Sequence, residues 1–125
     1  MKKEQRSFRR RIPIGNLYAA LGRDYERVGK IVDLSRGGLA FEYISDDNQI
    51  AEFSQIAIFK VGEVFHLHNL PCKIVYDILF DQQRNGIESL KRSRDRRCGI
   101  EFKALPEEDY TQLTMFIECN TKAVP

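Results

Sequence analysis

The stretch Asp33-Leu34-Ser35-Arg36-Gly37-Gly38 combines groups that could bind a small molecule. It supplies a carboxylate, a hydroxyl and two glycines between two apolar segments of strand length. Strand alternation places Asp33 and Ser35 on one face, because side chains two positions apart point the same way. Gly37 and Gly38 allow positive φ and let another group approach the backbone. The same residue types also form ordinary turns that bind nothing, so this stretch alone leaves both interpretations open.

A basic arm, Gln5-Arg6-Ser7-Phe8-Arg9-Arg10-Arg11-Ile12-Pro13, precedes this stretch. Arg6 and Arg10 stand four positions apart, with Arg9 and Arg11 as neighbouring substitutes. Arginine makes bidentate hydrogen bonds to phosphate oxygens and to guanine O6 and N7, and its flat guanidinium stacks on bases. The arm is therefore either an anion-binding segment or a solvated basic tail.

The two stretches together resemble the signature of the PilZ domain. That signature is a pair of arginines with three residues between them, followed by Asp/Asn-x-Ser-x-x-Gly, and Arg6 and Arg10 with Asp33, Ser35 and Gly38 fit it. The segments after residue 97 also resemble the closing strand and terminal helix of that family, so the resemblance covers nearly the whole chain. One departure is that the second arginine of the family directly precedes the first apolar residue of the barrel, a place held here by Arg11.

This resemblance implies a mostly β fold, namely a six-stranded antiparallel barrel of the split-barrel type with a C-terminal helix. It also implies that the chain binds cyclic di-GMP, a ligand with two guanines and two phosphodiesters. Arginines would hold the phosphates and guanine edges, Asp33 and Ser35 would recognise guanine, and the glycines would leave it room. The implied ligand residues are Arg6, Arg9, Arg10, Arg11, Asp33, Ser35, Gly37 and Gly38.

Length and composition agree with one globular domain. The chain has 125 residues, of which 42% are hydrophobic and 30% charged, and no apolar run approaches the roughly 20 residues of a membrane span. It has no secretory signal, and its three cysteines are an odd number without metal-ligand spacing, so we expect a cytoplasmic protein. Six basic residues and one acidic residue give positions 1–11 a net charge of +5, and positions 91–97 carry +4. Two short basic patches suit a compact anion better than a long polyanion.

Hydrophobic periodicity predicts short strands and one helix. Leu39, Phe41 and Tyr43 alternate with their neighbours, as in a half-buried strand. In the segment from Cys72 onward, alternation places Cys72, Ile74, Tyr76 and Ile78 on one face against Lys73 and Asp77. The expected elements are strands at 17–21, 28–32, 39–44, 53–61, 63–67, 72–80 and 97–103, and a helix at about 106–120. Residues 1–11 would then be a flexible arm, and residues 12–125 the barrel domain with its helix.

Five other residues carry weaker signals. His66 and His68 share a strand face and could bind a metal, but exposed strand residues are the better interpretation, and we expect no metal. Cys98 stands beside two arginines that could activate it, yet its place in an alternating segment favours a buried thiol. Arg96 and Arg97 could extend the anion site, or they could lie outside it. No catalytic motif occurs, so we expect neither an enzyme nor a cofactor.

The sequence therefore predicts a cyclic di-GMP receptor that acts through an unidentified effector protein in processes such as motility, pilus function or exopolysaccharide production. It would be a bacterial, cytoplasmic monomer or weak dimer without membrane insertion. One alternative is a PilZ-like protein adaptor that binds no nucleotide, although such adaptors generally lack the arginine arm. The other is a small nucleic-acid-binding barrel, which the scarcity of aromatic residues among the basic ones disfavours; we expect no nucleic acid polymer as partner.

Overall fold

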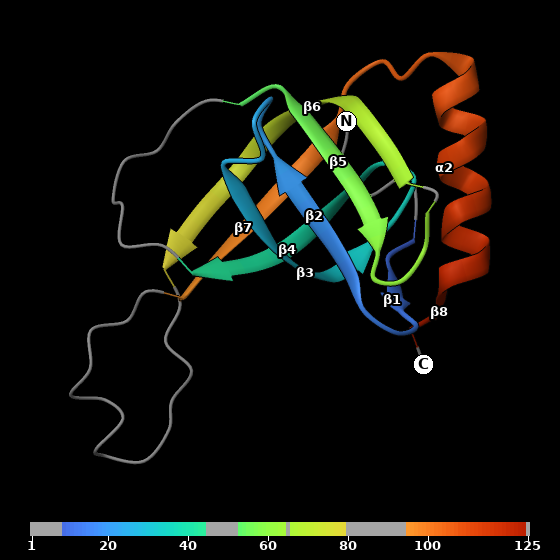
Figure 1. Cartoon of the computed structure of the whole chain (residues 1–125), viewed down its shortest axis with the longest axis horizontal. Helices are drawn as coiled ribbons and strands as arrows, with labels where there is room; N and C mark the ends of the chain where they lie inside the picture. The colour runs from blue at the N-terminus through green and yellow to red at the C-terminus, as the bar shows by residue number, and fades with distance from the viewer. Residues whose placement is uncertain (1–8, 45–52, 65, 80–94, 125) are drawn as a thin grey trace, which may run out of the picture.

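The computed structural model describes residues 9–44, 53–64, 66–79 and 95–124. Within these ranges the chain forms eight strands and one helix (Figure 1). The elements are β1 (Arg11–Pro13), β2 (Leu17–Leu21), β3 (Arg27–Leu34), β4 (Gly38–Ile44), β5 (Gln55–Lys60), β6 (His66–Leu79), β7 (Asp95–Phe102), α2 (Glu107–Asn120) and β8 (Thr121–Ala123). No helix among the described residues is both long and apolar enough to cross a bilayer.

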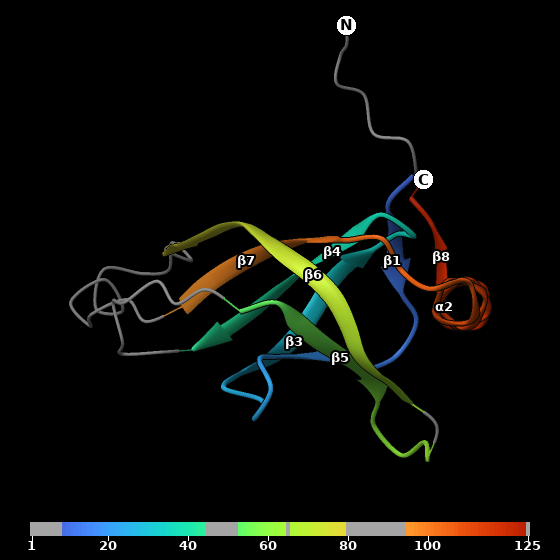
Figure 2. The same ribbon diagram turned by 90° about the horizontal axis from the view of Figure 1, so that it is seen from above.

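Six strands close into an antiparallel barrel in the order β2-β5-β6-β7-β4-β3, with β2 pairing β3 to complete the circle. The short strands β1 and β8 pair with each other, and β1 joins the sheet where Arg11 meets Leu34 of β3. Helix α2 stands beside the barrel on the side of β1 and β8, as the two views of Figures 1 and 2 show. The predicted six-stranded antiparallel barrel with a C-terminal helix is thus confirmed.

The core forms where the predicted apolar stripes meet. Leu39, Phe41 and Tyr43 of β4 are buried, as strand alternation predicts. Helix α2 begins after Pro106, carries acidic residues in its first turn, and buries Leu113, Phe116 and Ile117 against the barrel, while Tyr110 is half-buried. Local periodicity therefore located both the inner face of the barrel and the packed face of the helix.

The boundaries of β6 differ from the sequence-based prediction. Separate strands were expected at 63–67 and 72–80, whereas the structure has one continuous strand from His66 to Leu79. Asn69 has φ of 54°, and the pairing of β6 with β5 shifts between Ile56 and Ile58. Asparagine tolerates this left-handed conformation, so the residues that usually end a strand form a bulge within one.

A second irregularity in β6 reverses the predicted faces of its last residues. Ile74 pairs with Ile100, but Tyr76 pairs with Gly99, so one extra residue of β6 lies between them. Beyond this bulge the alternation is inverted: Asp77 pairs with the buried Cys98 and faces the barrel interior. The prediction that Tyr76 and Ile78 share the inner face of Cys72 and Ile74 was therefore wrong.

Strands β1 and β8 were not predicted, because three residues are too few to show a periodic pattern. Arg11, expected at the end of the flexible arm, belongs to β1. The rest of the expected arm up to residue 8 and the segment 80–94 lie outside the described residues.

Candidate functional site

The structure brings Arg10 and Asp33 together from positions 23 residues apart. Arg10 stands immediately before β1 and donates a hydrogen bond from Nη1 to Oδ2 of Asp33 at 3.0 Å. The side chains are 39% and 18% exposed, so solvent or a ligand can reach the ion pair. Arg9 is exposed, and Arg6 lies outside the described residues. One arginine of the arm therefore already meets the carboxylate of the Asp-x-Ser-x-x-Gly stretch.

Ser35 organises the turn between β3 and β4. Its Oγ accepts hydrogen bonds from the backbone N–H groups of Gly37 at 3.1 Å and Gly38 at 3.3 Å, and it also lies 3.3 Å from the Gly38 carbonyl. Its own N–H donates to the same Gly38 carbonyl at 2.8 Å. Such local side-chain hydrogen bonds fix a turn in place of a regular ladder. Ser35 thus holds the turn in shape and would have to exchange a bond to donate to a ligand.

The absence of a side chain at Gly38 is required by the neighbouring strand. A Cβ there would lie 2.0 Å from the backbone carbonyl oxygen of Ile100 in β7. The adjacent Gly37 accepts a hydrogen bond from the backbone N–H of Phe102 at 2.9 Å. Packing of the turn against β7 therefore explains the glycine without a ligand, whereas the sequence suggested clearance for one.

A row of four residues crosses the outer face of the barrel beside this turn. Asp33 pairs with Ala40, Ala40 with Gly99, and Gly99 with Tyr76. A Cβ at Gly99 would lie 2.2 Å from Cε2 of Tyr76, so the tyrosine ring covers the glycine. The row has a carboxylate at one end, an aromatic ring at the other and a floor of small residues between them, and we call it the outer row.

Arg97 stands on the same outer face, next to this row. It donates hydrogen bonds to Oε2 of Glu42, its pairing partner on β4. The hydrogen bond to Glu42 raises the pKa of Arg97, and the charges of Glu42, Tyr76 and Asp33 act in the same direction. Its side chain is 39% exposed. The outer face therefore carries a second guanidinium near Asp33.

The other predicted arginines lie elsewhere. Arg96 points into the barrel, where it is 6% exposed and paired with Asp77. Arg11 donates from Nε to Oγ1 of Thr121 at 2.7 Å and from Nη2 to the Thr121 carbonyl at 3.2 Å. Oγ1 of Thr121 in turn donates to the carbonyl of Ile117 at 2.6 Å, so Arg11 secures the C-terminal end of α2.

Three residues near the site had no clear sequence signal. Tyr76 was assigned to the wrong face because the bulge in β6 is invisible to simple alternation. Glu42 is 55 positions from Arg97, and nothing local predicts their pairing. Arg36, inside the Asp-x-Ser-x-x-Gly stretch, lies 6.0 Å from the ring centre of Tyr110 and so connects the turn to the first turns of α2.

This arrangement is suited to binding a flat, anionic molecule. Carboxylate oxygens accept hydrogen bonds from ring N–H groups, guanidinium groups bind phosphate, and an aromatic ring stacks on a base. The described residues contain no group of three or more His, Cys, Asp or Glu side chains placed to hold a metal ion. Burial raises the pKa of Cys98 to about 12, so this thiol stays protonated and is a buried structural group, as predicted.

Comparisons with known proteins agree with these features. The solved PilZ domain of YcgR from Escherichia coli with c-di-GMP has a TM-score of 0.65 and 16% identity, over 93% of this chain and 91% of that one. YcgR from Escherichia coli in complex with c-di-GMP gives 0.61 and 17%, over 93% of this chain and 46% of that one. MrkH, described as a c-di-GMP-dependent transcription regulatory factor, gives 0.63 and 14%, over 92% of this chain and 50% of that one.

The chain thus spans about half the length of the full YcgR structure and of MrkH, and nearly all of the isolated YcgR domain. At these identities the structures establish the fold. A search of curated proteins found no match. The model of the PilZ domain family matches residues 4–119. Because that match covers most of the chain, the protein belongs to the PilZ domain family.

Proposed function

We propose that this protein is a receptor for cyclic di-GMP and has no enzymatic activity. The observation that carries the proposal is the ion pair of Arg10 with Asp33 at 3.0 Å, on the outer face of a PilZ barrel and beside the Ser35 turn. Structural neighbours with 16% and 17% identity hold c-di-GMP, which supports the same ligand class for this chain.

Asp33 and Arg10 complement opposite edges of guanine. The N1–H and N2–H groups of guanine are donors, and the Asp33 carboxylate is an acceptor with four lone-pair sites. O6 and N7 of guanine are acceptors that match the fork of an arginine, as do phosphate oxygens. Arg10, with Arg6 four positions before it and Arg9 or Arg11 as substitutes, would therefore bind the guanine edge and the phosphodiesters.

Tyr76 and Arg97 extend this proposed site across the outer row. The Tyr76 ring covers Gly99, and Ala40 is buried, so a guanine beside Asp33 would stack on the outer side of that ring. Stacking of a base on an aromatic ring contributes about 1–3 kcal/mol. Arg97 is already neutralised by Glu42, so a phosphate would have to share or replace that carboxylate.

Ligand binding would act by exchanging ion pairs. Arg10 contacts Asp33, so a nucleotide that binds either side chain must share it with, or displace, its partner. Ordering backbone costs about 1–2 kcal/mol per residue, which several charge-assisted hydrogen bonds to a doubly charged ligand can offset. The arm would therefore change position with ligand, and a cytoplasmic effector protein would recognise the change; regulation of motility, pili or exopolysaccharide are candidate outputs.

Isothermal titration of the purified protein with cyclic di-GMP tests this proposal, with GTP and the linear dinucleotide as controls. We expect saturable binding at low micromolar concentration or below for the cyclic form alone, and stoichiometry will distinguish one nucleotide from a stacked pair. Absence of heat at high ligand concentration, together with an unchanged melting temperature, would reject the receptor and favour the protein-adaptor alternative.

A further inference from the structure

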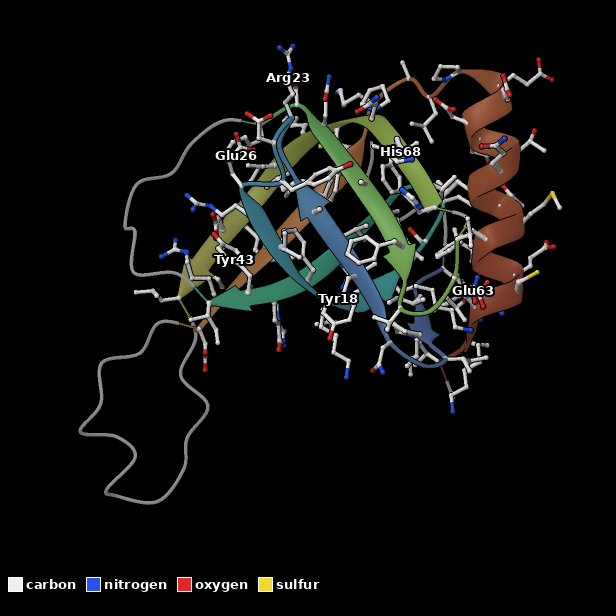
Figure 3. All side chains as sticks on the ribbon, viewed as in Figure 1. Tyr18, Arg23, Glu26, Tyr43, Glu63 and His68 are labelled. Atoms are coloured by element: carbon white, nitrogen blue, oxygen red, sulfur yellow. The ribbon has the colours of Figure 1, made fainter. Side chains whose placement is uncertain are left out.

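A polar cluster lies inside the barrel at the end away from α2. Arg96 donates from Nε to Oδ1 of Asp77 at 3.1 Å and from Nη2 to the Asp77 carbonyl at 3.0 Å. The hydroxyl of Tyr43 lies 2.8 and 2.7 Å from the two carboxylate oxygens of Asp77. The Arg96 and Asp77 side chains are 7% and 5% exposed. Figure 3 shows Tyr43 at this end of the barrel, on the far side from the helix. We call these three residues the inner cluster.

The inner cluster is fully satisfied, and a buried ion pair of this kind need not add to the stability of a barrel. Among the described residues no buried side-chain N or O atom lacks a hydrogen-bond partner. Burial lowers the pKa of Arg96, but the hydrogen bond and charge of Asp77 outweigh it and the net shift is upward. Burial and Asp77 also raise the pKa of Tyr43, so its hydroxyl remains a donor. Apolar residues of similar volume commonly replace such buried pairs without loss of stability.

The cluster stands directly behind the proposed ligand face. Asp77 follows Tyr76 on β6, and Arg96 precedes Arg97 on β7. In each pair one side chain points into the barrel and its neighbour points outward, because adjacent strand residues alternate. Leu79 pairs with Arg96 and Ile78 with Arg97, so the register is continuous through both pairs.

The extra residue Val75 creates this arrangement, and a second arrangement of the same strand is conceivable. Without the bulge, Tyr76 would continue the inner face of Ile74 and Asp77 would point outward. Arg96 would then be buried without its carboxylate. A buried charge that loses its partner is strongly unfavourable, so the cluster disfavours the register without the bulge.

We propose that Tyr43, Asp77 and Arg96 are positioning residues that select the bulged register of β6 and thereby place Tyr76 and Arg97 on the ligand face. The role in ligand binding rests on the proposed function; the selection of register does not. The residues touch no ligand themselves and act through their outward-facing neighbours.

A triple variant, Tyr43→Phe/Asp77→Leu/Arg96→Met, tests this proposal. It removes every polar side-chain atom of the cluster, and with Arg96 the donor to the Asp77 carbonyl, while it keeps the ring that Arg27 covers at 5.5 Å. We expect the melting temperature to stay within a few degrees of wild type or to rise. We also expect weaker NMR cross-peaks between the Tyr76 ring and the Gly99 α-protons, and a dissociation constant for cyclic di-GMP at least tenfold higher.

Two single variants and a control separate positioning from stability. Tyr43→Phe removes one hydroxyl and should weaken the cross-peaks and the affinity less than the triple variant does. Asp77→Asn keeps a carbonyl acceptor for Arg96 and should keep most of both signals, although the unpaired charge of Arg96 lowers its melting temperature. Cys72→Ala lowers stability at a buried position on β6 before the bulge, and should leave the cross-peaks and the affinity unchanged.

The outcomes distinguish this inference from the proposed function. If wild type binds no cyclic di-GMP, the proposed function fails, and the Tyr76–Gly99 cross-peaks still test the register. Wild-type cross-peaks in the triple variant overturn the inference. If the triple variant does not fold, the two single variants and Cys72→Ala decide. The inference is overturned if the affinity and the cross-peaks fall along with the melting temperature in all of these variants, Cys72→Ala included.

Discussion

Replacing Arg10 or Asp33 with alanine should strongly weaken nucleotide binding with little effect on the fold. The pair is 39% and 18% exposed, and such partly exposed ion pairs contribute about 0–1 kcal/mol to stability. For a domain of this size that corresponds to a change in melting temperature of no more than about 4 °C. Each side chain would supply charge-assisted hydrogen bonds to the ligand, worth about 1.5–3 kcal/mol. We therefore expect the dissociation constant to rise about 10- to 150-fold for either variant.

Titration calorimetry and thermal unfolding of the same samples measure the two quantities separately. Arg23→Ala and Asp24→Ala are matched controls, because they remove the same charges from exposed positions in the turn that precedes β3. Arg23 appears in Figure 3 at the turn between β2 and β3. Roughly 20 Å of strand β3 separates this turn from Asp33, so the control variants should bind like wild type.

Three results would refute the reasoning. Unfolding of Arg10→Ala or Asp33→Ala would mean that the pair maintains the barrel, so that loss of binding has no specific meaning. Unchanged affinity in a folded variant would mean that the nucleotide binds elsewhere. An equal loss in Arg23→Ala would show that general positive charge, and not the placement of Arg10, attracts the ligand.

Three further predictions follow from single contacts. Arg11→Ala should lower stability by about 1–2 kcal/mol, because it removes hydrogen bonds to Thr121, while affinity changes less than threefold; a loss as large as that of Arg10→Ala would assign Arg11 to the ligand. Gly38→Ala should cost about 3 kcal/mol or more in urea unfolding, since its Cβ meets backbone, and wild-type stability would disprove the close packing. Burial raises the pKa of Cys72 and of Cys98 from 9.0 to about 12 in the folded protein. In the unfolded chain the two thiols are not buried, so they lose their protons at a lower pH than in the folded protein. Stability should therefore be full below pH 9 and fall by about 1.4 kcal/mol per thiol by pH 10, and a flat profile would contradict this.

Much of the barrel could be predicted because its signals are local. Leu39, Phe41 and Tyr43 report the inner face of β4 through alternation alone, and Pro106 with the following acidic residues reports the start of α2. These patterns depend only on neighbouring residues and on which side of an element faces the core. They do not depend on how distant strands pair.

The features that were not predicted depend on pairing between distant strands. The bulge at Val75 exists because β6 has one residue more than β7 between two paired positions. The alternation within β6 alone cannot show how many residues β7 has there. Asn69 is a residue type that often ends a strand, but it lies within β6 because the pairing of β6 with β5 has a bulge there. The ion pair of Glu42 with Arg97 likewise depends on the register of β4 with β7.

The candidate site was partly predictable for a different reason. Arg10 and Asp33 were chosen from the spacing of a known signature, and the structure brings them into contact. Spacing favoured Arg10, but Arg11 holds the place directly before the first apolar residue, so the sequence kept Arg11 as a substitute. Tyr76 belongs to no signature, and only the register of the barrel places it in a row with Asp33.

Adjacent residues therefore have different roles: one lies on the outer face of the barrel, and its neighbour makes contacts that hold the fold together. Arg10 meets Asp33 while Arg11 holds the end of α2, and Arg97 faces outward while Arg96 is buried on Asp77. Because neighbours in an extended chain point in opposite directions, one shift in register would exchange these roles. Comparing each arginine with its immediate neighbour is consequently the sharpest test of the site. The two variants change the same charge at nearly the same place and differ only in the face that loses it.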